Sequence, residues 1–245
     1  MKLLILAAGQ GKRLGCEETQ IPKVMRHALG KPLLQYVLNA ADFIPPEDTW
    51  AILGFRKEVV LEAYPTLNYV EQTERLGTGH AVMCAADTFK DYEGDIMVIN
   101  GDMPLLSRKT LEETIRLHRE KGAECTMVSF IVKGDIPPFG HIIRDEDGYV
   151  AQIVEHKDAT EEQRLIRELN AGLYVFKSPV LFEALTRIKR SPVSGEYYIT
   201  DLPAAIAEAG GKTAVYVLED EDEVLGVNTA EDLEAVEAAL LKRKQ

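Results

Sequence analysis

The residues best suited to chemistry lie in one short stretch near the N-terminus. Gly9 and Gly11 follow an apolar run, and the basic residues Arg13 and Lys23 come close behind them. Glycines at a strand end leave backbone N–H groups bare, and cations beside such groups favour an anionic ligand, phosphate above all. The stretch therefore predicts a phosphate-binding loop, although a structural turn explains a lone pair of glycines equally well.

This glycine spacing matches neither of the two best-known phosphate motifs. Leu14 stands where the dinucleotide fingerprint needs its third glycine. Only one residue separates Gly9 from Gly11, whereas a P-loop has four residues between its glycines and then Lys-Ser/Thr. The loop is thus predicted to be of another type.

Asp102 is the best candidate for a metal ligand. It follows an apolar run over residues 95–100, so its carboxylate projects from the carboxyl end of an expected strand. Open α/β sheets bind ligands at that edge. An aspartate facing a phosphate loop needs a divalent cation between them, and Mg²⁺ takes one or two protein oxygens beside substrate phosphates. Asn228 is a candidate second ligand. Taken alone, each residue is better explained by a turn or a helix cap.

A second glycine-rich stretch, Gln72–Val82, has features of a base-binding segment. Gln72 offers both a donor and an acceptor to a base edge, and Gly77 and Gly79 allow the backbone to approach a planar ring. His80 begins an expected helix and fits a structural role better than a catalytic one. The other histidines lack metal-ligand spacing, and no nucleophile motif such as G-x-S-x-G occurs in the sequence.

The elements that must position these residues alternate between strands and helices in the first half of the chain. The pattern predicts strands over residues 2–8, 50–54, 95–100 and 125–132, and helices over residues 32–42, 78–88 and 107–121. Ser107 is the expected N-cap of the last of these helices, and Gly122 its stop. This alternation predicts an α/β, Rossmann-like fold of three layers, with a mostly parallel sheet and helices on both faces.

The pattern then changes to a meander. Residues 140–176 are expected to form a strand, an acidic turn, a second strand, a polar helix and a third strand. We expect residues 133–176 to form a small β-rich lobe. Ser178 and Pro179 are the expected N-cap and first residue of the next helix, followed by a strand over 213–218 and a C-terminal helix over 229–245. No repeat or linker divides residues 1–245, which predicts a single domain.

Composition excludes several classes of function. The net charge of −12 leaves no basic face for nucleic acid, and no apolar run approaches the ~20 residues of a membrane helix. The N-terminal run lacks a signal peptide's cleavage site. Three widely spaced cysteines predict neither disulfides nor zinc. We expect a cytoplasmic protein whose partners are small molecules.

Seven motifs together resemble the sugar-1-phosphate nucleotidyltransferase family. In chain order they are LAAGQGKRL…PKV, LGTGHAV, NGDMPL, FGHIIRDEDGYVAQIVEHKDAT, LNAGLYVF, GEYYITDL and GVN. They span nearly the whole chain, and the resemblance is strongest to the uridylyltransferases that make UDP-N-acetylglucosamine, a cell-wall precursor. It implies Mg²⁺-dependent synthesis of UDP-N-acetylglucosamine and pyrophosphate from UTP and N-acetylglucosamine 1-phosphate.

The resemblance also implies roles for individual residues. The implied nucleotide contacts are Leu6, Ala7, Ala8, Gly9, Gln72, Gly77 and Thr78. The implied sugar contacts are Gly140, Glu155, Asn170, Tyr198 and Thr200. The implied pyrophosphate cations, which are the catalytic residues, are Arg13 and Lys23, and the implied metal ligands are Asp102 and Asn228. A sugar phosphate is already ionised at neutral pH, so no general base is expected.

The sequence departs from the family pattern in several places. The loop between Arg13 and Pro22 is longer than usual, and Asn100 replaces a common tyrosine. The hexapeptide-repeat β-helix of the bifunctional relatives, which carries acetyl transfer and trimerisation, is not found in these residues. We therefore expect a uridylyltransferase without that module, and no oligomeric state is predicted.

Two alternatives remain open. One is a related transferase that uses glucose 1-phosphate, another sugar or another base. The other is a catalytically silent nucleotide-sugar sensor. Retention of Arg13, Lys23, Asp102 and Asn228 argues against a sensor, which needs no pyrophosphate cations.

Overall fold

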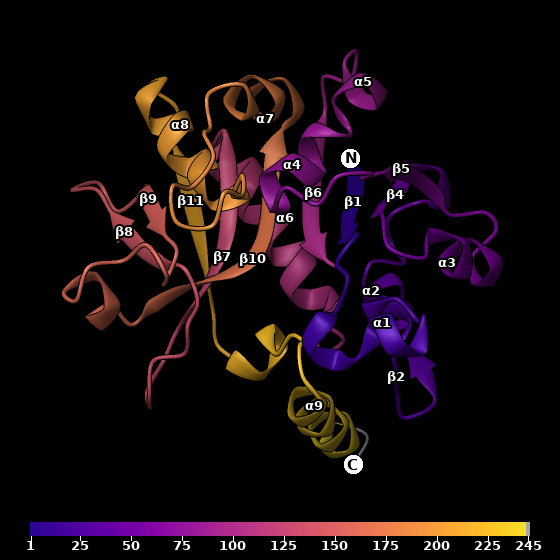
Figure 1. Ribbon diagram of the computed structural model, residues 1–245. Helices are drawn as coiled ribbons and strands as arrows, with labels where there is room; N and C mark the ends of the chain where they lie inside the picture. The colour runs from indigo at the N-terminus through magenta and orange to yellow at the C-terminus, as the bar shows by residue number, and fades with distance from the viewer. Residues whose placement is uncertain (244–245) are drawn as a thin grey trace.

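The structure is a computed structural model that describes residues 1–243. Its centre is a nine-stranded sheet, in which seven strands follow the order β11-β7-β10-β6-β1-β4-β5 and the hairpin β8-β9 joins through β10 (Figure 1). The strands are β1 (Lys2–Ala7), β4 (Thr49–Leu53), β5 (Asn68–Glu71), β6 (Asp95–Asn100), β7 (Cys125–Ile131), β8 (His141–Arg144), β9 (Val150–Val154), β10 (Glu168–Lys177) and β11 (Thr213–Leu218). A separate small ribbon pairs β2 (His27–Ala28) with β3 (Lys31–Pro32).

Strand direction decides which residues meet at the functional edge. Strands β1, β4, β5 and β6 run parallel, and β11 runs parallel to β7. Strand β10 runs antiparallel to both β6 and β7. The carboxyl ends of the parallel strands therefore share one edge with the N-terminal half of β10. The predicted α/β fold with a mostly parallel, mixed sheet is confirmed.

Helices cover both faces of the sheet. They are α1 (Cys16–Thr19), α2 (Leu33–Ala40), α3 (Lys57–Ala63), α4 (Thr78–Met83), α5 (Ala86–Phe89), α6 (Arg108–Lys121), α7 (Ser178–Leu185), α8 (Leu202–Glu208) and α9 (Ala230–Lys242), with 3-10 turns η1 (Lys12–Leu14), η2 (Lys23–Met25), η3 (Pro46–Asp48), η4 (Gln163–Leu165), η5 (Ile199–Asp201) and η6 (Glu221–Val224). Among residues 1–243, none of the helices combines the length and apolar character needed to span a membrane.

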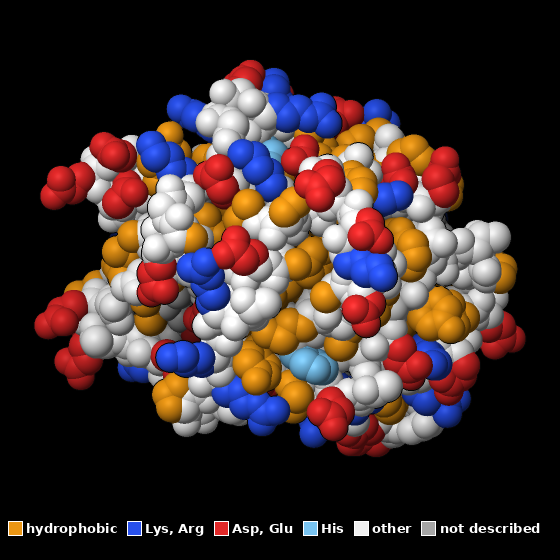
Figure 2. Space-filling model, turned by 90° about the horizontal axis from the view of Figure 1, so that it is seen from above, with side chains coloured by type: hydrophobic (Ala, Val, Ile, Leu, Met, Phe, Trp, Pro, Cys, Tyr) orange, Lys and Arg blue, Asp and Glu red, His pale blue; other side chains and the backbone are white. Residues whose placement is uncertain are grey.

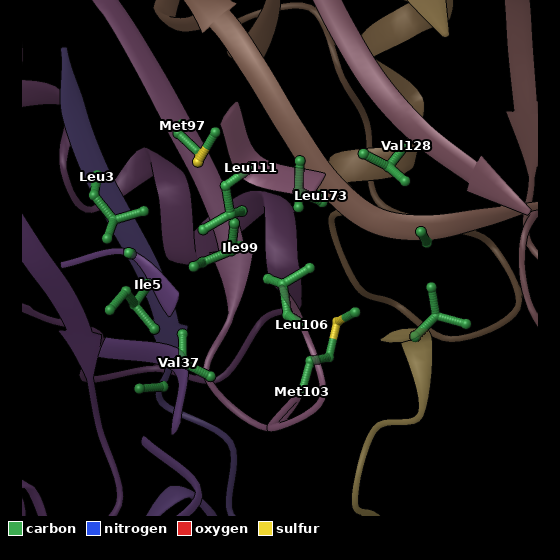
Figure 3. Close-up of a cluster of buried hydrophobic side chains, with 14 of the residues drawn as sticks. Leu3, Ile5, Val37, Met97, Ile99, Met103, Leu106, Leu111, Val128 and Leu173 are labelled. Carbon is green, nitrogen blue, oxygen red and sulfur yellow. The ribbon is translucent and has the colours of Figure 1, made fainter. Parts of the chain in front are cut away.

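Strand β1 shows why the central strands are apolar throughout. Leu3 and Ile5 pack with residues of α2, α3 and α6 on one face, and Figure 3 shows Val37 and Leu111 on this side. Leu4 points to the opposite face, where it packs with residues of α4, α5, α7 and α8. Successive side chains of a strand alternate between faces, so a strand covered on both sides must be apolar at every position.

Capping geometry confirms the predicted ends of α6 and the predicted start of α9. The Ser107 side chain accepts from the backbone N–H of Thr110, and Gly122 ends α6 in the left-handed conformation. Thr229 begins α9 through a capping box with Asp232. The described part of the expected 229–245 helix is thus present, and residues 244–245 lie outside the described residues.

Three local expectations were wrong. The helix over 78–88 is broken into α4 and α5, because Ala85 N–H bonds back to Val82 at 3.0 Å instead of continuing the α-helical ladder. The polar helix of the meander is only the turn η4, since the chain enters β10 at Glu168. Ser178 is the first residue of α7 rather than its N-cap, which is Lys177.

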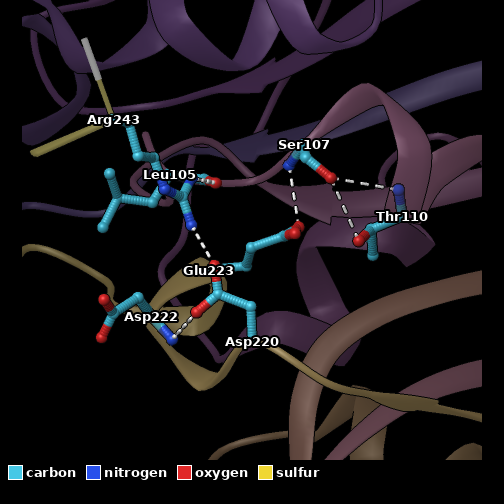
Figure 4. Close-up of polar contacts among 7 residues, drawn as sticks. All are labelled: Leu105, Ser107, Thr110, Asp220, Asp222, Glu223 and Arg243. Atoms are coloured by element: carbon cyan, nitrogen blue, oxygen red, sulfur yellow. Dashed lines mark hydrogen bonds and ion pairs between the residues drawn. The ribbon is translucent and has the colours of Figure 1, made fainter. Parts of the chain in front are cut away.

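Polar contacts join the C-terminal end of α9 to the loop after β6 and to the segment before η6 (Figure 4). The Arg243 guanidinium donates to the backbone oxygen of Leu105 and to Asp220 Oδ2, the latter at 2.8 Å. Glu223 Oε2 accepts the backbone N–H of Ser107 at 2.9 Å. These bonds hold α9 and η6 against the loop that leads from β6 to α6.

Charge is distributed over the surface. On the face drawn in Figure 2, acidic and basic side chains are interspersed, with hydrophobic side chains between them. The excess of 40 acidic over 28 basic residues gives the chain its charge of −12. A cluster of cations at a functional site would therefore stand out against an acidic background.

Candidate functional site

Two cavities meet at the carboxyl edge of the parallel strands. The first, here called the loop cavity, has a volume of about 490 Å³ and includes the loop after β1, Gln72 and Arg75. The second, the meander cavity, has a volume of about 310 Å³ and is lined largely by the meander and β10. Thr78, Asn100 and Asp102 line both. Their shared boundary is where groups bound in the two cavities would come together.

The loop after β1 is shaped around Gly11. Its φ is +64°, and a Cβ added there would lie 2.6 Å from Cys16 Sγ and 3.0 Å from Lys23 Cβ. A side chain would therefore push the loop away from Lys23. The Gly11 carbonyl also accepts from the backbone N–H of Leu14 at 3.0 Å. The glycine is thus required by close approach and backbone conformation together.

Lys23 connects the predicted phosphate loop to both predicted metal ligands. Its Nζ lies 2.7 Å from Asn228 Oδ1 and forms an ion pair with Asp102 Oδ2. The Lys23 and Asp102 side chains are only 14% and 20% exposed. Two protein oxygens therefore converge on one cation at the boundary between the cavities.

The backbone explains why Asp102 and Asn228 come together. Val227 N–H donates to the Asp102 carbonyl at 3.1 Å, which places the segment before Asn228 alongside the loop after β6. A Cβ on Gly226 would lie 3.9 Å from both Asp102 Oδ1 and Asn228 Nδ2. Residues 225–228 belong to neither a helix nor a strand.

Gln72 and Gly77 form the far wall of the loop cavity. Gln72 Nε2 donates to the Gly77 carbonyl at 3.1 Å, and the side chain is 5% exposed. Gly77 has a φ of +101°, and a Cβ there would lie 2.4 Å from the Tyr197 carbonyl. Thr78 Oγ1 accepts the backbone N–H of Ile199 at 3.1 Å. These contacts tie the predicted base-binding segment to the turn η5.

The meander cavity collects most of the predicted sugar residues. Thr200 Oγ1 donates to Glu155 Oε1 at 2.7 Å, and Asn170 N–H donates to the Gly140 carbonyl at 2.8 Å. Burial raises the pKa of the Glu155 carboxyl, while the Thr200 hydrogen bond acts in the opposite direction. Asn170 Oδ1 accepts from the backbone N–H of Gly172 at 3.0 Å. Asn170 also lines the cavity.

Apart from Lys23, three predicted residues line neither cavity. Ala7 packs in the hydrophobic core, and Arg13 is exposed on η1. Tyr198 donates its hydroxyl to Ser194 Oγ at 2.6 Å and lines a separate pocket with Asp158 and Asp201. Their predicted roles stay predictions. The remaining predicted site residues line one cavity or the other, apart from Lys23, which reaches the boundary through its ion pair.

Several lining residues were not among the residues predicted for the site, and Lys12, Arg75, Asn100 and Tyr174 are four of them. Lys12 and Arg75 add cations to the loop cavity. Asn100 lies on the shared boundary, and Tyr174 lines the meander cavity. Arg75 could have been found from its place inside the glycine-rich stretch after Gln72. No sequence feature marked Tyr174 as a site residue, because it lies within the apolar run expected of a buried strand.

The structure is an α/β fold in which the Lys23–Asp102 ion pair lies between two cavities. Residues 2–223 match the family described as Nucleotidyl transferase, and the chain belongs to that family. The predicted resemblance is confirmed. The chain is 40% identical over 226 residues to Bifunctional protein GlmU of Geobacillus thermodenitrificans, covering 92% of this chain and 48% of that protein. It is also 40% identical over 242 residues to Bifunctional protein GlmU of Exiguobacterium sibiricum, covering 98% and 53%.

The chain spans about half the length of these curated relatives. A crystal structure of UDP-glucose pyrophosphorylase complexed with UDP-glucose superposes with a TM-score of 0.77. The two sequences are 19% identical, and the match covers 99% of this chain and 98% of the other. That likeness establishes the shared fold.

Proposed function

We propose that this protein transfers a uridylyl group from UTP to N-acetylglucosamine 1-phosphate, forming UDP-N-acetylglucosamine and pyrophosphate. The proposal rests on one observation. The Lys23 ammonium contacts both Asp102 and Asn228 at the boundary of two cavities. Such a boundary is where the α-phosphate of a nucleotide and the phosphate of a sugar would meet. The membership of the nucleotidyl transferase family supports the same reaction type.

The loop cavity suits the nucleotide. Gln72 and Gly77 lie on one wall, and the bare glycine loop with Lys12 lies on the other. Backbone N–H groups and a lysine favour the triphosphate, and the Gln72 amide suits a base edge. We assign the leaving pyrophosphate to Lys23 together with Arg13, which lies in the same loop.

The meander cavity suits the sugar. Glu155 offers a carboxylate held by Thr200, and Asn170 offers an amide. Together they match the hydroxyl groups and the acetamido N–H of an amino sugar. A site built on hydrogen bonds discriminates strongly against a substrate that leaves one of them unpaired.

The residues present fit a magnesium ion. The Lys23 ammonium already occupies a position where Asp102 Oδ2 and Asn228 Oδ1 converge on positive charge. Within the described part of the chain, no three His, Cys, Asp or Glu side chains gather in a way that could hold a metal. A site with few protein oxygens is typical of Mg²⁺ bound with substrate phosphates. When bound, Mg²⁺ would neutralise charge on the phosphates.

The protein's own part in the reaction is binding and orientation. The sugar phosphate needs no general base, because its attacking oxygen is already ionised. The loop and meander cavities hold the two substrates on opposite sides of Asp102, which favours in-line attack on the α-phosphorus. The Lys23 ammonium stabilises the negative charge that develops on the departing pyrophosphate.

The test is a coupled pyrophosphate-release assay with a panel of nucleotides and sugar phosphates. We expect UTP with N-acetylglucosamine 1-phosphate to give the highest kcat/KM. A preference for glucose 1-phosphate would overturn the sugar assignment and leave nucleotidyl transfer intact. Failure to release pyrophosphate with any pair would overturn the catalytic proposal.

Asp102→Asn tests the metal assignment within that assay. We expect kcat to fall by about three orders of magnitude, because charge neutralisation at the phosphates contributes several kcal/mol. Asp91→Asn, at an exposed aspartate, is the control and should leave kcat unchanged. Near-normal turnover of Asp102→Asn at saturating Mg²⁺ would contradict the assignment.

A further inference from the structure

The buried hydroxyl of Tyr174, a residue that lines the meander cavity, has no hydrogen-bond partner among residues 1–243. Tyr174 lies on β10 and is 1% exposed. The partly buried Tyr36, by contrast, donates to the Ala28 carbonyl at 2.8 Å. The Tyr174 hydroxyl is therefore an unused donor at a cavity wall.

An unpartnered hydroxyl is costly to the folded protein. Burying such a group without a hydrogen bond costs about 1–3 kcal/mol. A phenylalanine would fill the same space at this position without that cost. The hydroxyl is explained if a ligand in the cavity supplies the missing partner.

The surroundings hold Tyr174 rigidly. Its backbone pairs with Val98 of β6 on one side and with Met127 of β7 on the other. Its ring stacks on Phe176, with 5.5 Å between centroids. Just before it, the register shifts between Asn170 and Tyr174, and Gly172 has a φ of +74°. The bulge turns this part of β10 toward the cavity, and the flanking strands fix where the hydroxyl lies.

The electrostatic surroundings keep the phenol neutral. Burial raises the pKa of Tyr174 well above its ordinary value, and the charge of Glu155 adds to this. The Asn170 side chain acts in the opposite direction. The hydroxyl therefore keeps its proton and can donate it in a hydrogen bond. Beside Glu155, an acceptor, it completes a donor–acceptor pair.

We propose that Tyr174 donates a hydrogen bond to an oxygen of the sugar moiety and is a specificity-determining residue of the meander cavity. This inference rests on the proposed function, because it takes the meander cavity as the sugar site. It assigns to Tyr174 a contact made with the sugar and not with the nucleotide.

The test is Tyr174→Phe, which removes one oxygen and keeps the ring. We expect the KM for the sugar phosphate to rise about tenfold, the value of one hydrogen bond of about 1.4 kcal/mol, while the KM for UTP stays unchanged. The melting temperature should stay the same or rise, because an unpartnered polar group is removed. Tyr36→Phe is the matched control: it should lower the melting temperature and leave the sugar KM unchanged.

Calorimetric binding of UDP-N-acetylglucosamine and UDP-glucose separates this inference from the proposed function. If the wild type binds a sugar nucleotide and Tyr174→Phe binds it equally well, the Tyr174 assignment is overturned and the proposed function stands. If the wild type prefers glucose 1-phosphate, the variant should show the same loss with that sugar. If the wild type binds neither sugar nucleotide, both proposals fail.

Discussion

At the scale of single residues, Lys23 is the centre of the candidate site. One ammonium group forms an ion pair with Asp102 and donates a hydrogen bond to the side-chain oxygen of Asn228. The same group is the cation assigned to the pyrophosphate. Binding of metal and nucleotide would therefore require Lys23 to exchange its protein carboxylate for a substrate phosphate.

Lys23→Met tests this exchange. Without the ammonium, Asp102 and Asn228 have no competing cation, so Mn²⁺ should bind more tightly to the nucleotide-free protein. Turnover should nevertheless fall by about 10²–10³-fold in both directions, the usual effect of losing one preorganised electrostatic group. Metal titration followed by magnetic resonance and steady-state kinetics measure the two effects.

Lys12→Met is the control for this prediction, because Lys12 lines the loop cavity and is exposed. It should leave Mn²⁺ affinity without nucleotide unchanged. An effect of Lys23→Met confined to the KM for UTP would show that Lys23 only binds the triphosphate.

Asp201 gives a prediction about pH. Burial, with the nearby charges of Glu155 and Asp158, raises the pKa of Asp201 from 3.8 to about 6. A raised carboxyl pKa means that the folded state binds the proton more tightly than the unfolded state. The resulting stabilisation is complete below about pH 4 and is lost as the pH rises through about 6.

Asp201→Asn removes this titration. We expect the variant to melt at a higher temperature than the wild type at pH 7, and the difference to shrink as the pH approaches 4. Thermal melts across this pH range measure the effect, with Asp91→Asn as the exposed control. A difference in melting temperature that does not change with pH would contradict the prediction.

At the scale of elements, the start of α9 determines the position of Asn228. Asp232 Oδ2 accepts the backbone N–H of Asn228 at 2.8 Å and that of Thr229 at 2.9 Å. One carboxylate thus caps the helix and holds the residue just before it. The metal-site proposal consequently depends on a helix cap that makes no contact with substrate.

Asp232→Ala separates positioning from stability. We expect a loss of about 1 kcal/mol in the free energy of unfolding, as for other capping residues, and a higher Mg²⁺ concentration for half-maximal activity. Glu234→Ala, at an exposed residue of the same helix, should change neither. If the Mg²⁺ requirement of Asp232→Ala equals that of the wild type, the cap only stabilises the helix.

At the scale of the whole molecule, α9 packs against the glycine-rich loop after β1. Val236 and Leu240 share a hydrophobic cluster with Leu14 and Cys16, which lie in that loop. The Glu237 carboxylate also accepts the backbone N–H of Leu29 at 2.8 Å. The last helix of the described chain therefore packs under the first functional segment.

Val236→Ala tests this support. Val236 is fully buried, so the substitution should cost about 2 kcal/mol through lost packing and a cavity. It should also raise the KM for UTP, because the loop loses part of the hydrophobic packing that holds it in place. Val128→Ala, at a residue 1% exposed in another cluster, should cost similar stability without changing that KM. Equal KM effects in both variants would contradict the prediction.

The amino-acid sequence by itself determined the main strands, the two long capped helices and the glycine-rich turn after β1. These features depend on local chemistry: apolar runs, Ser107 and Thr229 as caps, Gly122 as a stop, and glycines beside cations. The ordered motifs also identified the family, because each motif is a continuous segment that can be recognised in the sequence alone.

Only the tertiary structure decided which side chains meet. Lys23 and Asn228 are 205 residues apart and are joined by packing of the C-terminal segment against the loop after β6. Tyr198 points to another pocket, whereas Tyr174 lines the meander cavity. The direction of each side chain depends on strand register, the bulge at Gly172 and the antiparallel course of β10. Register, bulge and strand direction are non-local properties, because they arise only when strands from distant parts of the chain pair.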